Sequence, residues 1–247
     1  PALIRLIEKL SRDAAAKDGW HGLLVGDMSQ PRGGPMMDGH ASHQIGLDTD
    51  IWLMPMPDHI LTRAERETMK PVSMVRHGTL QINPQTWTKA QARLIMRAAS
   101  YPEVQRIFVH PAIKKELCEG WRGDRSDLGK VRPYWGHMWH MHIRIKCPPG
   151  SPDCRPQTPI PAGDGCGKPL AWWFTDEPWK PAKPSKKPAK PHVTTLADLP
   201  KACRRVLEAP AKTPVAAVTY QVPAAAAFAD LPPSADIPVP IARPAAH

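Results

Sequence analysis

The amino-acid sequence predicts an α+β fold with a small, mainly antiparallel β-sheet, surrounding helices and long loops, followed by a Pro/Ala/Lys-rich tail. Helical and strand-like segments follow one another without the regular rhythm of β–α–β units, which argues against a parallel sheet. After about residue 175 proline, alanine and lysine become frequent, and nearly half of the 31 prolines fall in this last part. We therefore expect a folded domain over residues 1–175 and a largely disordered tail over residues 176–247.

Four segments show the spacing of apolar residues that helices have. Residues 2–17 and 88–99 are amphipathic, and Thr88 is a suitable N-cap for the second of them. Residues 59–69 and 111–117 predict two shorter helices. These helices supply the apolar surfaces that a small sheet needs for its core.

Four further segments predict strands. Residues 23–27 and 104–109 are short apolar runs, the second rich in β-branched and aromatic residues. Residues 47–53 and 140–146 alternate between polar and apolar side chains, as half-buried strands do. Each of these last two therefore has one polar face that is available for a site.

The polar faces carry the residues that point to chemistry. Asp48 and Asp50 share a face of the first alternating strand, and His140 and His142 share a face of the second. Successive side chains on one face are about 7 Å apart at the backbone, so one imidazole can bind a metal while the other reaches its water. Five of the eleven histidines lie in or just before these two windows: His40, His43, His137, His140 and His142.

This arrangement predicts a metal site. Two imidazoles and a carboxylate from separate segments, with an open position for water, are the usual ligand set of a catalytic zinc. A lone histidine is more often a hydrogen-bonded or solvated side chain. The spacing of His43 and Asp50, combined with a His-x-His strand, rarely arises by chance in one modest domain.

The five cysteines contain no Cys-x-x-Cys pair, which argues against a structural zinc knuckle. Cys147 and Cys154 enclose a turn-rich loop of a length that a disulfide closes easily. Buried free thiols in a cytosolic protein are the alternative. We expect disulfides and hence export, with the odd cysteine pairing outside this chain and a signal peptide preceding it.

The net charge of +10 is spread along the chain and suits an anionic polymer or surface. No cluster of Lys and Arg is interleaved with aromatic residues, so we expect no nucleic-acid partner. No apolar run reaches the roughly 18 residues of a membrane-spanning helix. In the tail, we expect residues 180–191 to be extended, a short helix after Pro200 around Cys203 to dock back, and disorder beyond Ala209.

The two windows also carry a resemblance. Residues 42–50 with 140–142 are similar to the motif pair of the lysostaphin-type and D-Ala-D-Ala metallopeptidases. The sequence resembles more closely the penicillin-insensitive murein endopeptidases of Gram-negative bacteria. The stretches that carry this closer resemblance are 30–35, 39–44, 106–109 and 142–148. It extends from about Asp27 to Trp173 and returns weakly at residues 199–203.

The resemblance implies a zinc bound by His43, Asp50 and His142, with water in the fourth position. It implies that His140 is the general base and that His137 is a second catalytic imidazole. No glutamate lies between Glu119 and His142. The base should therefore be a histidine, unlike the glutamate of the D-Ala-D-Ala dipeptidases.

His40 and Asp48 remain as residues that support the ligands rather than bind the metal. For the cysteines, the resemblance implies the pairs Cys118–Cys166 and Cys147–Cys154. Cys203 is then left to bond a cysteine upstream of this chain.

The substrate implied by the resemblance is cross-linked peptidoglycan in the periplasm, cut between D-alanine and meso-diaminopimelate and in some cases between two diaminopimelates. A D,D-carboxypeptidase or dipeptidase of cell-wall peptides is an alternative that uses the same metal ligands. A non-catalytic, zinc-containing cell-wall-binding module is another. The oligomeric state stays open, a homodimer included.

Overall fold

We describe the protein from a computed structural model, which covers residues 2–36, 40–181 and 195–210. The extended segment expected at residues 180–191 and the disorder expected beyond Ala209 lie almost wholly outside these described residues. The account below therefore concerns the folded part and the short segment around Cys203.

Four strands form one sheet in the order β1-β4-β2-β3. β4 pairs antiparallel with both β1 and β2, and β2 pairs parallel with β3. The strands are β1 (Asp48–Trp52), β2 (Val104–Val109), β3 (Val131–Pro133) and β4 (His140–Ile145). The sheet confirms the predicted α+β class, with mainly antiparallel pairing.

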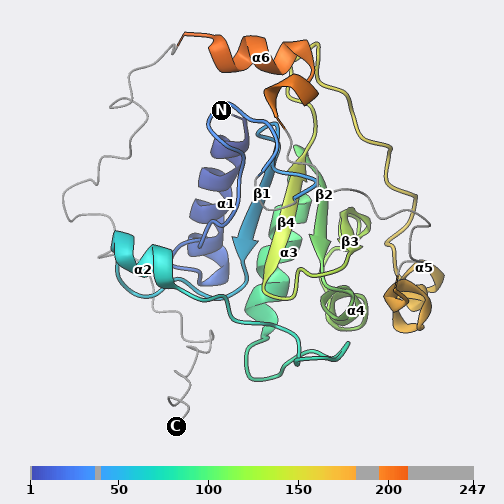
Figure 1. Ribbon diagram of the computed structural model, residues 1–247. Coiled ribbons are helices and arrows are strands. Elements are labelled where there is room, and N and C mark those ends of the chain that lie inside the picture. Colours follow the sequence, from blue (N-terminus) through green and yellow to red (C-terminus); the bar gives the residue numbers. More distant parts are fainter. Residues whose placement is uncertain (1, 37–39, 182–194, 211–247) are drawn as a thin grey trace.

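Helices pack on the sheet and on one another (Figure 1). α1 packs on α3, α3 on β2, and α4 on β3. The helices are α1 (Ala2–Asp18), α2 (Arg63–Thr68), α3 (Lys89–Ser100), α4 (Pro111–Gly120), α5 (Lys168–Ala171) and α6 (Lys201–Glu208). None of these helices is long and apolar enough to cross a bilayer.

The core lies where the apolar face of the sheet meets α1 and α3. Met141, Ile143 and Ile145 of β4 are almost completely buried, as are Ile51 of β1 and Ile107 of β2. This alternation is the one that the sequence predicted for β4. It leaves His140, His142 and Arg144 on the opposite face.

That opposite face is buried as well, which the sequence did not predict. His142 is 4% exposed and Arg144 is 8% exposed, so β4 is covered on both sides. The prediction of a half-buried strand with an open polar face is therefore wrong for this strand. Its polar side chains are covered because they contact one another and the loops that cross this face.

Two predicted elements differ in extent. Residues 23–27 form one isolated bridge, Val25 to Ile51, rather than a strand. Gly26 lies so close to β1 that a Cβ there would be 2.9 Å from Trp52 Nε1. The predicted helix over residues 59–69 begins only at Arg63, because the side chains of Thr62 and Glu65 cap it in a reciprocal capping box.

Thr88 caps α3 as predicted. Its hydroxyl accepts a hydrogen bond from Ala90 N at 3.2 Å, and Gln91 Oε1 accepts one from Thr88 N at 2.8 Å. The carboxamide of Gln91, fully buried, also donates to Leu53 O at 3.1 Å. The same box therefore ties the start of α3 to the chain just after β1.

The two disulfides implied by the resemblance are both present, Cys118–Cys166 and Cys147–Cys154. Cys203 is unpaired within the part of the chain described. Cys118 belongs to α4 and Cys166 just precedes α5, so the first disulfide holds α5 beside α4.

α6 ends against the loop at residues 30–35. The guanidinium of Arg32 donates to Val206 O and Leu207 O, both at 2.9 Å, and to Ala209 O. Carbonyls of the last turn have no partner within a helix, so Arg32 supplies one from a distant loop.

Candidate metal centre

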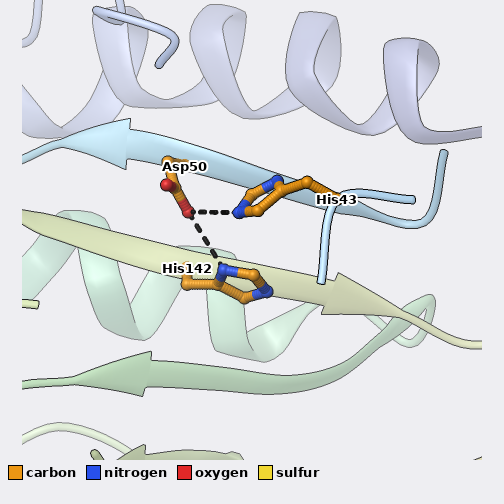
Figure 2. Close-up of side chains that lie close together, drawn as sticks. All are labelled: His43, Asp50 and His142. Atoms are coloured by element: carbon orange, nitrogen blue, oxygen red, sulfur yellow. Dashed lines mark ion pairs between the residues drawn. The ribbon is translucent and has the colours of Figure 1, made fainter. Parts of the chain in front are cut away.

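His43, Asp50 and His142 lie together in the interior, with one possible ligand atom from each within 4.8 Å of the others. Asp50 and His142 face each other in the register of β1 and β4, and His43 comes from the loop before β1. Figure 2 shows one oxygen of Asp50 with an ion pair to each of the two imidazoles, which lie close to each other. Their exposed fractions are 1%, 5% and 4%, so the cluster is shielded from solvent.

Asp50 is the centre of this cluster. Its Oδ1 lies 3.1 Å from Nδ1 of His142 and 3.4 Å from Nε2 of His43. Its Oδ2 lies 3.5 Å from Nε2 of His140. One carboxylate therefore meets three imidazoles drawn from both predicted windows.

The loop that carries His43 has an unusual backbone. His43 has φ 59°, in the left-handed region that costs energy for a residue with a side chain. Gly34 N donates to Gln44 O at 2.8 Å, and a Cβ on Gly33 would lie 2.6 Å from the same oxygen. The close approach of the loop at residues 30–35 thus holds the His43 turn and requires glycine at residue 33.

Asp48 holds His142 from the other side. Nε2 of His142 lies 3.0 Å from Asp48 Oδ1, and Arg144 Nη1 donates to Asp48 Oδ2 at 2.6 Å. These contacts fix the ring and leave Nδ1 directed at Asp50. A carboxylate behind the far nitrogen of an imidazole is the usual support of a metal-binding histidine.

His140 and His137 lie next to the cluster. Their ring centroids are 4.8 Å apart, and His137 is 5.9 Å from His142 by the same measure. Nδ1 of His137 is 2.6 Å from Trp135 O, and its backbone has φ 57°. The tight turn at residues 135–137 therefore directs this imidazole toward the cluster.

His40 and Asp27 form a pair at the edge of the cluster. His40 Nε2 lies 3.6 Å from Asp27 Oδ2, and its ring centroid is 5.3 Å from that of His43. His40 is thus beside His43 but outside the three-residue cluster. The contact with Asp27 was not predicted, because nothing in the spacing of the sequence brings residue 27 to this place.

Buried charges shift the pKa values of the cluster. Burial opposes ionisation of Asp50, but its contacts with His142 and His43 hold the pKa of its carboxyl well below the usual range. Burial works to lower the pKa of His142, but Asp48 and Asp50 on either side raise it to about 9. A place that holds a proton between two carboxylates also attracts a metal cation.

The pKa values of His137 and His140 shift in the opposite direction to that of His142. Burial lowers the pKa of His137 to about 4, against the effect of its hydrogen bond to Trp135 O. Burial also lowers the pKa of His140, with Asp50 acting against it. Both rings are therefore neutral near pH 7 and each has a lone pair to accept a proton.

The donor set fits a zinc ion. Two imidazole nitrogens and a carboxylate oxygen are the ligands that catalytic zinc takes in proteins. Asp50 Oδ1 lies between the two imidazoles and is a buried oxygen without a hydrogen bond of good geometry. Such atoms are costly unless a partner of another kind satisfies them.

Comparison with known proteins identifies a family. The family model of the penicillin-insensitive murein endopeptidases matches residues 1–208. Proteins of this name from Yersinia enterocolitica and Pectobacterium atrosepticum are 42% and 41% identical over 208 residues, which is 84% of this chain and 72% and 71% of theirs. One from Haemophilus influenzae is 41% identical over 210 residues, 85% of this chain and 70% of its own.

Proposed function

Since this chain belongs to the penicillin-insensitive murein endopeptidase family, we propose that it hydrolyses peptide cross-links of peptidoglycan with a zinc ion bound by His43, Asp50 and His142. The bond cut is the one between D-alanine and meso-diaminopimelate, or between two diaminopimelates. The compartment is the periplasm. The two disulfides support export, since such bonds persist in oxidising compartments.

The observation that carries this proposal is the carboxylate of Asp50, buried among three imidazoles with its Oδ1 lacking a hydrogen bond. A purely structural cluster would be expected to satisfy that oxygen. When bound, the metal supplies Lewis-acid activation of water and of the scissile carbonyl.

His140 is the general base of the proposed reaction. It shares Asp50 with the ligands and is neutral near pH 7, so it can accept a proton from the attacking water and return it to the leaving amine. His137 lies next to His140 and is the second catalytic imidazole of the scheme. Its Nδ1–H is used by Trp135 O, so it stabilises the oxyanion only after Nε2 has taken up a proton during the reaction.

Asp48 and Arg144 are positioning residues in this scheme. Asp48 orients the ring of His142, and Arg144 holds Asp48. His40, beside His43 and paired with Asp27, supports the loop that carries the first ligand. Burial of the whole cluster excludes bulk water, which strengthens each electrostatic contact.

The test is mass spectrometry of purified muropeptides before and after digestion, with cross-linked and uncross-linked peptides supplied separately. We expect cross-linked species to fall and monomers to rise. A chelator should stop the reaction and added zinc should restore it. Trimming of the uncross-linked peptides alone would indicate a D,D-carboxypeptidase and overturn the proposal.

Binding to sacculi by zinc-loaded protein without release of soluble peptides would indicate a cell-wall-binding module instead. His140→Ala separates the roles within the site, because it should keep the metal and lose turnover. His59→Ala is the matched control, since His59 is half exposed and contacts Glu65 away from the cluster. A near-wild-type rate for His140→Ala would refute the assignment of the base.

A further inference from the structure

Aromatic side chains gather on the surface beside the candidate metal centre. Among the described residues, the aromatic side chains that are well exposed are Tyr134, Trp135, Trp172 and Trp179, with exposed fractions of 44%, 42%, 44% and 40%. Scattered exposed apolar residues are normal, but a contiguous exposed patch marks a binding surface. We call these four residues, with Trp173 beneath them, the aromatic platform.

The rings of the platform are held in place. Trp135 Nε1 donates to Pro178 O at 2.8 Å, and Trp179 Nε1 donates to Trp173 O at 2.9 Å. Trp173 is buried, and its ring centroid lies 4.6 Å from that of Trp135 and 5.2 Å from that of Trp172. Because backbone carbonyls satisfy two indole N–H groups, these rings offer apolar surface in a fixed orientation.

The segment that carries three of these tryptophans is also anchored covalently. Trp172, Trp173 and Trp179 follow α5, which begins two residues after Cys166. The Cys118–Cys166 disulfide joins this segment to α4. A preorganised surface binds with less loss of conformational entropy than a mobile one.

The platform is continuous with the candidate metal centre. The ring centroids of His142 and His137 are 5.9 Å apart, and those of His137 and Tyr134 are 5.8 Å apart. The ring centroids of Tyr134 and Trp135 are 5.1 Å apart. Each step is an aromatic contact, so no other element separates the platform from the imidazole proposed to act in catalysis.

We propose that the aromatic platform binds the glycan part of peptidoglycan while the stem peptide occupies the metal centre. This inference rests on the proposed function. One face of a pyranose ring presents C–H groups, which suit the negative face of an indole. The stem peptides carry charged carboxylates, which suit the metal centre better than four uncharged aromatic rings.

The scale of the substrate agrees with this placement. A stem peptide of four residues reaches about 13 Å when extended. The path from His142 to Tyr134, the near edge of the platform, runs in two steps of 5.9 and 5.8 Å. A peptide whose cross-link lies at the metal centre can therefore bring its sugar to Tyr134, and the glycan strand continues from there over the tryptophans.

Trp172 is the residue to change. Its side chain is exposed, and its indole packs edge-on against Trp173. For Trp172→Ala we expect the ratio of kcat/KM on disaccharide-bearing cross-linked muropeptides to kcat/KM on the same peptides without sugar to fall about three- to tenfold. Trp172→Phe keeps an aromatic face and should recover most of that ratio. Ile60→Ala removes an exposed apolar side chain near α2 and should leave the ratio unchanged.

A second measurement needs no turnover. Titration of the full chain with N-acetylchitotetraose should quench tryptophan fluorescence saturably, and Trp172→Ala should weaken the apparent affinity by a similar factor. An unchanged ratio together with no saturable quenching would overturn the glycan proposal. A shift from dimer to monomer in Trp172→Ala, with the ratio unchanged, would assign the platform to a second copy of the chain and overturn it too.

Failure of the proposed function would look different. A protein that cuts neither substrate but binds N-acetylchitotetraose through Trp172 would refute the endopeptidase activity and keep the platform as a glycan site.

Discussion

The candidate metal centre and the surroundings of Lys114 both bury ionisable groups, but they satisfy them differently. At the candidate metal centre, the buried Asp50 carboxylate meets the imidazoles of His43 and His142, and its Oδ1 has no hydrogen bond of good geometry. Lys114, in α4, is fully buried, and its Nζ donates to Leu128 O at 2.8 Å and to Asp164 O at 2.6 Å. The unsatisfied oxygen of Asp50 lies among residue types that bind metals, which indicates a ligand, whereas the backbone partners of Lys114 indicate a structural tie.

The hydrogen bonds of Lys114 hold the loop that contains Asp164 against α4. Asp164 lies in the loop that leads to Cys166, and Arg125 donates to the Asp164 side chain at 2.8 Å. Lys114 and the Cys118–Cys166 disulfide therefore hold the same loop against α4. Four variants test this contrast, in order of decreasing expected effect.

The largest effect is expected for Asp50→Ala. This change removes the carboxylate common to three imidazoles, so metal binding and activity should be lost together, with the rate falling roughly a thousandfold or more. Metal content by mass spectrometry and cleavage of cross-linked muropeptides measure the two losses. Retention of one equivalent of zinc with full activity would refute the role of Asp50.

Asp48→Asn should weaken the metal centre without abolishing it. The amide keeps an oxygen near His142 Nε2 but loses the charge that pairs with Arg144. We expect zinc affinity to fall about 10- to 100-fold, as for other changes behind a metal ligand. Competition with a chelator of known affinity measures this. Asp18→Asn is the matched control, because it breaks a buried pair with Arg97 in a different part of the protein.

Lys114→Met tests the surroundings of Lys114 through the pH dependence of the free energy of unfolding. Burial lowers the pKa of Lys114 to about 7, with Asp164 acting against it, while an unfolded lysine stays near 10.5. Between these values the unfolded chain binds one more proton than the folded chain, so this group makes the free energy of unfolding rise with pH by up to about 1.4 kcal/mol per pH unit. Below pH 7 both forms are protonated and the slope disappears.

Denaturant unfolding of both proteins between pH 7 and 9.5 measures the difference. The wild type should gain stability relative to Lys114→Met as the pH rises. Parallel curves would show that the lysine keeps its ordinary pKa. Zinc affinity should be unaffected, since Lys114 is outside the metal centre.

The smallest effect is expected for His110→Asn. His110 is a buried histidine whose Nδ1 accepts a hydrogen bond from Ala112 N at 3.1 Å as the N-cap of α4. Asparagine is a good N-cap, so stability at pH 7.5 should change by less than about 1 kcal/mol and zinc content should stay the same. A loss of zinc would place His110 in the site and contradict the contrast between satisfied and unsatisfied groups.

The sequence predicted the residues that meet in the candidate metal centre because their signals are local. A period of two places Asp48 with Asp50, and His140 with His142, whatever their neighbours are. Their mutual contacts were not predictable from that period. The contact of Asp48 with His142 depends on how β1 and β4 pair and on which ring nitrogen each carboxylate meets.

Burial of charge was the main failure of the sequence reasoning. Arg144 lies on the face of β4 that the alternation predicted to be open, yet it is buried and paired with Asp48. Lys114 carried a usable signal, since it lies three residues from Pro111 and from Leu117 on the apolar side of α4. The sequence gives no signal that the aromatic platform forms, because the Cys118–Cys166 disulfide and tertiary packing bring residues 172–179 to Trp135.

The pairing of β1 with β4 also sets the time at which the metal centre can exist. Asp48 and His142 are separated by 94 residues, and β4 is the last of the strands in the described residues to leave the ribosome. A chain that is still being made, or one cut before residue 140, carries His43 and Asp50 but lacks the other donor. In the proposed mechanism, a chain therefore needs all the strands that bring these donors together before it can hydrolyse peptidoglycan.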